Sequence, residues 1–143
     1  MPEDLRKKIS SNLFKKYVGM SEEVLAHEIY LNYDKMKCMK HCGMFFCMHG
    51  YDHYWMNKLD HKTLTNDIIR GLDCMKGLLD ENHWVMNYPY GSYSDDVMMI
   101  CKEKGCVLGL STEVRIADLQ KDNPFALPRL DTNDFPPKGK YGL

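Results

Sequence analysis

Two histidines four positions apart, His49 and His53, are the residues whose type and spacing best suit a chemical role. They follow the apolar run 44–48, whose length is typical of a strand buried on both faces of a parallel sheet. Gly50 allows a sharp turn after that strand. Parallel α/β sheets place ligands at the C-terminal ends of their strands, and His-x-x-x-His can direct two ring nitrogens at one divalent ion, such as zinc. The alternative is that the two imidazoles only pack and cap a loop.

The composition indicates what this chain does not bind. With 19 basic and 20 acidic residues, it has no excess of positive charge for a nucleic acid or an anionic membrane surface. Its apolar runs are too short for a membrane span. The first residues do not form an apolar signal region, so we expect a cytoplasmic protein. Its six cysteines are then expected to be reduced, buried thiols.

Hydrophobic periodicity and capping residues predict alternating helices and strands. The predicted helices cover residues 4–17, 21–31, 33–42, 64–79 and 94–105, with a single helical turn at 116–119. The predicted strands cover residues 44–48, 83–87 and 106–110, with a further strand possible at 125–127. Helix 21–31 is expected to bury Val24, Leu25 and Ile29. Alternating helices and strands predict an α/β fold with a parallel sheet.

Three short motifs stand in the order found in a known family. They are His49-Gly50-Tyr51-Asp52-His53, then Asn87-Tyr88-Pro89-Tyr90-Gly91, then Leu127-Pro128-Arg129-Leu130-Asp131. Together they make roughly residues 30–135 resemble the polysaccharide deacetylases of the NodB-homology type (carbohydrate esterase family 4). The resemblance implies a partial (β/α) barrel, with a parallel sheet flanked by helices and an N-terminal helical segment. It implies one domain over 1–143, with a helical segment at 1–31, a deacetylase-like core at 32–135 and a tail at 136–143.

The resemblance also implies a function and the residues that serve it. Family members hydrolyse N- or O-acetyl groups on carbohydrate with the help of a divalent metal ion, so an N-acetylated sugar is the expected partner. The expected metal ligands are His49 and His53. The residues expected to bind substrate are Tyr88, Pro89, Tyr90, Arg129 and Asp131.

The sequence has Asn87 where many family members place Arg, and it lacks two motifs of the family. Nothing before His49 resembles the Thr-Phe-Asp-Asp motif that supplies a catalytic base and a third metal ligand, and no Leu-x-His follows His83. We therefore expect hydrolysis to be impaired; the alternative is a carbohydrate-binding or interaction module that has lost the chemistry. Half a barrel would also leave sheet edges uncovered, which favours association, so a homodimer is possible.

Overall fold

The structure is a computed structural model in which residues 1–141 are described. The chain divides into two compact units, Met1–Phe45 and Phe46–Leu143, and we describe each by itself. The division into 1–31, 32–135 and 136–143 inside one domain remains a prediction.

The first unit consists of the three predicted helices, α1 (Glu3–Tyr17), α2 (Glu22–Ile29) and α3 (Tyr33–His41). Two of them are capped by the side chain that precedes their first residue. The Ser21 hydroxyl accepts a hydrogen bond from the backbone N–H of Val24, and the Asn32 side chain accepts one from Lys35. These caps satisfy amides that have no partner within the helix.

The predicted burial of α2 is wrong. Val24 is 53% exposed and Ile29 60% exposed, Leu25 is only half-buried, and none of the three helices contains a buried residue. The reason is that an apolar stripe is buried only when another element covers it. Within Met1–Phe45 the three short helices do not enclose a core.

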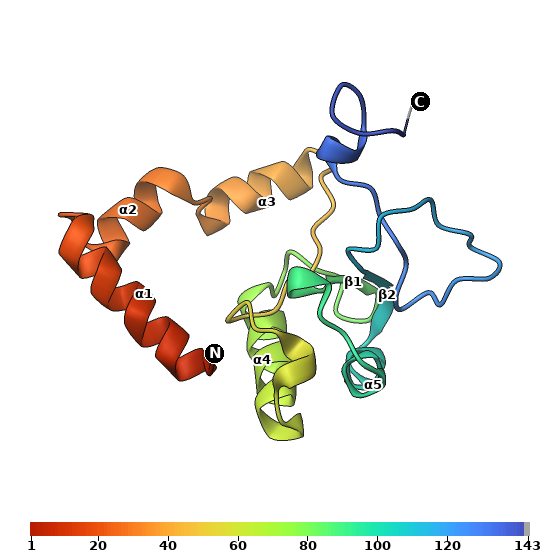
Figure 1. Cartoon of the computed structure of the whole chain (residues 1–143), viewed down its shortest axis with the longest axis horizontal. Coiled ribbons are helices and arrows are strands. Elements are labelled where there is room, and N and C mark those ends of the chain that lie inside the picture. Colours follow the sequence, from red (N-terminus) through yellow and green to blue (C-terminus); the bar gives the residue numbers. More distant parts are fainter. Residues whose placement is uncertain (142–143) are drawn as a thin grey trace. The chain divides into compact units, whose positions relative to one another are not determined.

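The second unit contains the parallel sheet that the sequence predicts. Strands β1 (Trp84–Asn87) and β2 (Cys106–Leu110) pair in parallel and are connected through helix α5 (Asp95–Glu103), as Figure 1 shows. On the outer side of β2, Leu127 forms a single parallel bridge with Leu110. The α/β class and the parallel sheet are therefore confirmed.

The core of this unit forms where α4 (His61–Cys74) and α5 pack together beside the sheet. The apolar stripe predicted for α4 is correct, because Leu64 and Ile68 are fully buried. Helix α4 is capped by Asp60, whose carboxylate accepts hydrogen bonds from Thr63. The buried core cluster consists of Met48, Met56, Leu64, Ile68, Leu79, Trp84, Met86, Tyr88, Val97, Ile100, Cys101 and Cys106.

The predicted strand at 44–48 is wrong except at its last residue. Met48 is buried and pairs with β1, donating its N–H to Val85 and accepting from Asn87, both at 2.8 Å. Met44 and Phe45 are 58% and 70% exposed. Of residues 44–48, all within the described part of the chain, Met48 alone forms a bridge to β1. An apolar run without ladder partners does not become a buried strand.

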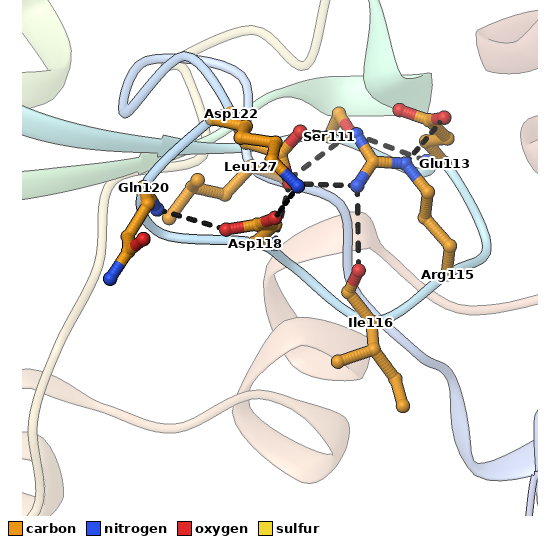
Figure 2. Close-up of polar contacts among 9 residues, drawn as sticks. Ser111, Glu113, Arg115, Ile116, Asp118, Gln120, Asp122 and Leu127 are labelled. Carbon is orange, nitrogen blue, oxygen red and sulfur yellow. Dashed lines mark hydrogen bonds and ion pairs between the residues drawn. The ribbon is translucent and has the colours of Figure 1, made fainter.

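The helical turn predicted at 116–119 is also wrong, since these residues form an open loop with Ile116 72% exposed. An ion pair replaces the helix as the organising contact (Figure 2). The guanidinium of Arg115 donates two hydrogen bonds of 2.7 Å to the carboxylate of Asp122 and a third to Glu113. The same carboxylate accepts the backbone N–H of Asp118. These bonds close the loop across seven residues, a span that one helical turn cannot provide.

The ion pair makes the loop sensitive to acid. Hydrogen bonds from Arg115 lower the pKa of Asp122 from 3.8 to about 2. A lowered pKa in the folded state means that the stabilisation is complete above about pH 4 and is lost as the pH falls through about 2. We expect the amide NMR signal of Asp118 to keep its position from pH 7 to pH 4 and to move between pH 4 and pH 2.

The matched control is Asp122→Asn, in which the Asp118 signal should be displaced at every pH. In the unmodified chain, a shift of the Asp118 signal with its midpoint near pH 4 would contradict the assignment, because the carboxylate would then be titrating near its ordinary pKa of 3.8.

All six cysteine thiols are free. Cys101 and Cys106 are buried as predicted, and burial raises the pKa of each thiol. Cys38, Cys42 and Cys74 are exposed, so the prediction of burial is wrong for these three. Within residues 1–141, no helix combines the length and the apolar character needed to cross a bilayer.

Candidate functional site

The two histidines lie on the loop that leaves Met48 at the end of its short pairing with β1. This loop turns sharply at Gly50, which has a φ of +71°, and again at His53, which has a φ of +55°. A positive φ is unusual for a residue other than glycine and costs on the order of 1–3 kcal/mol. The loop therefore holds His53 in a conformation that must be stabilised by its contacts.

The turn brings the two imidazoles together edge to face, with their ring planes 66° apart. Their Nε2 atoms are 3.0 Å apart and the ring centroids 4.8 Å apart. Two nitrogens bound to one tetrahedral zinc ion at about 2.0–2.1 Å are separated by about 3.3 Å. The observed 3.0 Å is a hydrogen-bond distance between the two rings, and it is also close to the separation that a shared ion requires. Both rings are exposed to solvent.

The other ring nitrogens are occupied. His49 Nδ1 lies 2.6 Å from the backbone oxygen of Asn87, and His53 Nδ1 lies 3.2 Å from the hydroxyl of Tyr90. A carbonyl oxygen only accepts hydrogen bonds, so His49 must carry a proton on Nδ1. In the neutral ring, Nε2 then has no proton and its lone pair can bind a metal ion. A histidine that ligates a metal is commonly fixed in this way, by a bond from its second nitrogen to a carbonyl.

The pair does not form a complete metal site by itself. No group of three or more His, Cys, Asp or Glu side chains suited to a metal lies within the part of the chain that the structure describes. Asp52, between the two histidines in sequence, faces Arg70 on α4 at 3.4 Å. The donor chemistry therefore fits a divalent ion, but it supplies two ligands where catalytic zinc sites usually have three from the protein.

The segment predicted to contact substrate divides into buried and exposed parts. Tyr88 and Pro89 are fully buried, and the Tyr88 hydroxyl donates to the backbone oxygen of Phe125. Burial also raises the pKa of that phenol. Only Tyr90 is exposed, and it too has a positive φ, of +57°. Its ring is stacked on Trp55 with centroids 4.5 Å apart and planes 7° from parallel. Of the three residues, only Tyr90 offers a side chain to a ligand.

The two late charged residues have different positions. Arg129 donates to the backbone oxygen of Ser111 at 2.9 Å and approaches the side-chain oxygen of Asn87 at 3.5 Å. Asn87 in turn holds His49, so Arg129 is connected to the histidine pair through one residue. Asp131 instead caps the short helix η3 (Thr132–Asp134), and hydrogen bonds from Asn133 lower the pKa of its carboxyl group. The structure does not bring Asp131 to the pair.

Sequence reasoning missed two residues that shape this site. Trp55 forms the stack with Tyr90, but a single tryptophan after a histidine motif gives no distinctive signal. Asp67 contacts the histidine loop from α4. The sequence does contain a feature that could have identified it. It shares the buried face with Leu64, Ile68 and Gly71, and an acid on the apolar face of a helix is unusual.

The sequence profile described as polysaccharide deacetylase matches residues 9–108. The chain belongs to the polysaccharide deacetylase family. This confirms the resemblance recognised in its motifs. A curated relative in the family, the putative polysaccharide deacetylase YxkH of Bacillus subtilis (strain 168), is 22% identical over 123 residues, covering 82% of this chain and 44% of the relative.

Solved structures agree with the family assignment. The Streptococcus pyogenes deacetylase PplD, in complex with acetate, has a TM-score of 0.64 and 27% identity, covering 71% of this chain and 44% of PplD. IcaB from Ammonifex degensii has a TM-score of 0.61 at 20% identity, covering 73% of this chain and 50% of IcaB. The likeness to IcaB supports the fold alone. This chain thus spans about half the length of the curated relative and of the two solved chains that it matches.

Proposed function

We propose that this chain binds a divalent ion, zinc by preference, through His49 and His53, and that it receives an N-acetylated carbohydrate beside that ion. The observation that carries the proposal is the 3.0 Å separation of the two Nε2 atoms while both Nδ1 atoms have other partners. Imidazole nitrogen is a favoured ligand of zinc, and family membership favours acetylated carbohydrate as the substrate class.

The roles of the protein groups follow from their hydrogen bonds. Asn87 holds His49 through its backbone oxygen, and the hydroxyl of Tyr90 fixes the ring of His53. When His53 ligates an ion its proton must lie on Nδ1, which then donates to Tyr90. A divalent ion supplies Lewis-acid chemistry, polarising an acetyl carbonyl.

We further propose that hydrolysis by this chain alone is very slow. Within residues 1–141 no carboxylate joins the two histidines in a group suited to a metal, so solvent or another polypeptide would have to complete the coordination. The same absence leaves no evident general base beside the pair. Loss of one member of a cooperating catalytic set typically lowers the rate by several orders of magnitude.

The exposed aromatic stack is the part of the site suited to a sugar ring. Trp55 and Tyr90 are 46% and 44% exposed, and Tyr90 is bonded to His53. Flat aromatic faces pack against the C–H groups of a pyranose ring. A carbohydrate lying on this stack would have its substituents beside the histidine pair.

This stack also favours the second candidate function, a carbohydrate-binding module without catalytic activity. Such a module needs the aromatic surface and does not need a base. The two functions differ in one measurable respect, because only the enzyme releases acetate.

Two features of assembly belong to the same proposal. The sheet of this chain would form part of a (β/α) barrel, as its likeness to proteins about twice its length suggests. A homodimer would cover exposed apolar residues such as Met44 and Phe45, and light scattering on dilute protein would distinguish it from a monomer of 16.7 kDa.

The proposal is tested by titrating the zinc-loaded chain with an oligomer of N-acetylglucosamine in a calorimeter, and by measuring acetate release in parallel. We expect binding with barely detectable release. Trp55→Ala should weaken sugar binding by about tenfold, whereas Trp55→Phe keeps a flat ring and should retain most of it. No binding of either zinc or the sugar would contradict the proposal, and rapid acetate release that depends on His53 would contradict the predicted impairment.

A further inference from the structure

Asp67 is a buried carboxylate on α4. Its side chain lies on the apolar face of the helix, and the residue is only 2% exposed. Moving a carboxylate out of water costs several kcal/mol unless hydrogen bonds compensate for the lost hydration. The partners of Asp67 therefore determine why such a residue is tolerated at this position.

Both oxygens of Asp67 accept hydrogen bonds from the backbone of the histidine loop. Oδ2 accepts the N–H of Tyr51 at 3.1 Å, and Oδ1 accepts the N–H of Asp52 at 2.9 Å. In residues 1–141 the carboxylate makes no ion pair within 4.0 Å. It therefore acts on the loop through two amides, and such charge-assisted bonds are stronger than neutral ones.

These two amides lie at the centre of the loop, midway between His49 and His53. The chain passes so close to the carboxylate at Gly50 that a Cβ there would lie 3.1 Å from Oδ2. Four residues in an extended strand would carry the two histidines more than about 13 Å apart. Here the chain doubles back around the carboxylate, and the Nε2 atoms are 3.0 Å apart.

A second contact from α4 supports the same loop at its outer side. Arg70, one turn after Asp67, lies 3.4 Å from the carboxylate of Asp52 and 3.9 Å from the ring centroid of Tyr51. This contact is exposed, so it is weak. The buried carboxylate of Asp67 is therefore the main connection between helix and loop.

We propose that Asp67 is the positioning residue of the histidine pair: by binding the amides of Tyr51 and Asp52 it bends the loop so that His49 and His53 converge. It touches no ligand itself. The inference rests on the proposed function only in taking a divalent ion as the ligand of the pair. Its effect on the imidazoles is independent of any ligand.

The test compares Asp67→Asn with Asp73→Asn in the full chain. Asparagine has nearly the shape of aspartate, but its NH₂ group would face a backbone N–H, so one of the two bonds is lost. Asp73 is on the same helix and is exposed, so its substitution changes the charge without touching the loop. Zinc affinity is measured by calorimetry, and imidazole protonation by long-range ¹H–¹⁵N NMR of the zinc-free chain.

We expect Asp67→Asn to weaken zinc binding by about 10- to 100-fold and to abolish the distinct spectrum of a His49 ring protonated on Nδ1. Asp73→Asn should leave both unchanged. Wild-type zinc affinity and an unchanged imidazole spectrum in Asp67→Asn would overturn the inference, whatever happens to thermal stability. If the unmodified chain binds no zinc, the metal proposal fails, while the imidazole spectrum still decides the role of Asp67.

A measurement on the unmodified chain covers the case in which Asp67→Asn does not fold. The amides of Tyr51 and Asp52 belong to an exposed loop, yet we expect hydrogen exchange as slow as that of buried amides in α4. Fast exchange at both positions would show that the carboxylate does not hold the loop, and it would overturn the inference.

Discussion

Replacing His53 by alanine should weaken zinc binding by at least about 100-fold, more than the usual effect of changing a residue that merely orients a ligand. The reason is that the described part of the chain offers only two nitrogens to the ion, and removal of one leaves a single imidazole. His49→Ala should have a similar effect. The double variant should be little worse than either single one, since residues that act as a unit are not additive. Competition with a zinc-sensitive dye provides the affinities.

His83→Ala is the matched control, because it removes one imidazole from the same unit at an exposed position 3.8 Å from Asp80. Its zinc affinity should equal that of the unmodified chain. Equal affinities in His53→Ala and the unmodified chain would place the ion elsewhere. The exposed thiols of Cys38 and Cys42 would then be the first residues to test.

The elements that could be predicted from the sequence are those determined by local interactions. Ser21, Asn32, Asp60 and Ser94 each cap the helix that follows. A cap depends on a side chain and an amide three residues later, and both are visible in the sequence. The stripe of α4 was also predictable, since it depends on helical spacing.

The elements that were mispredicted depend on distant partners. Residues 44–47 have a strand-like composition, but strand pairing at this edge of β1 reaches only Met48. The helical turn at 116–119 was displaced by the Arg115–Asp122 pair, seven residues apart. Neither the pairing partner of an apolar run nor a non-helical ion pair can be recognised from local pattern alone.

The candidate site likewise combines a feature that is visible in the local sequence with features that depend on distant residues. The spacing of His49 and His53 indicated that they could converge, but not what bends the loop between them. The carboxylate that contacts this loop is 14 residues beyond His53, on a helix, and only the three-dimensional fold brings it there. Tyr90 was expected to bind substrate, and its hydroxyl also fixes His53. Both contacts depend on tertiary structure.

The largest loss of stability is expected for Trp84→Ala. The indole of Trp84 is fully buried at the start of β1, within the core that α4, α5 and the sheet share. Its Nε1–H donates to the backbone oxygen of Lys104 at the end of α5, at 2.8 Å. Truncating a buried tryptophan removes apolar contacts and leaves a cavity, so the free energy of unfolding should fall by about 3–5 kcal/mol. This is a large share of the roughly 5–15 kcal/mol typical of a whole domain.

The chain contains two tryptophans, so Trp55→Ala is a control of identical chemistry. Trp55 is 46% exposed and stacks on the exposed ring of Tyr90, and its removal should lower the free energy of unfolding by no more than about 1 kcal/mol. Urea unfolding followed through the amide NMR signals of β1 and β2 reports the second unit without interference from α1–α3. Equal losses in the two variants would mean that the indole of Trp84 is not a core residue, and the packing of α5 on the sheet would then need a different explanation.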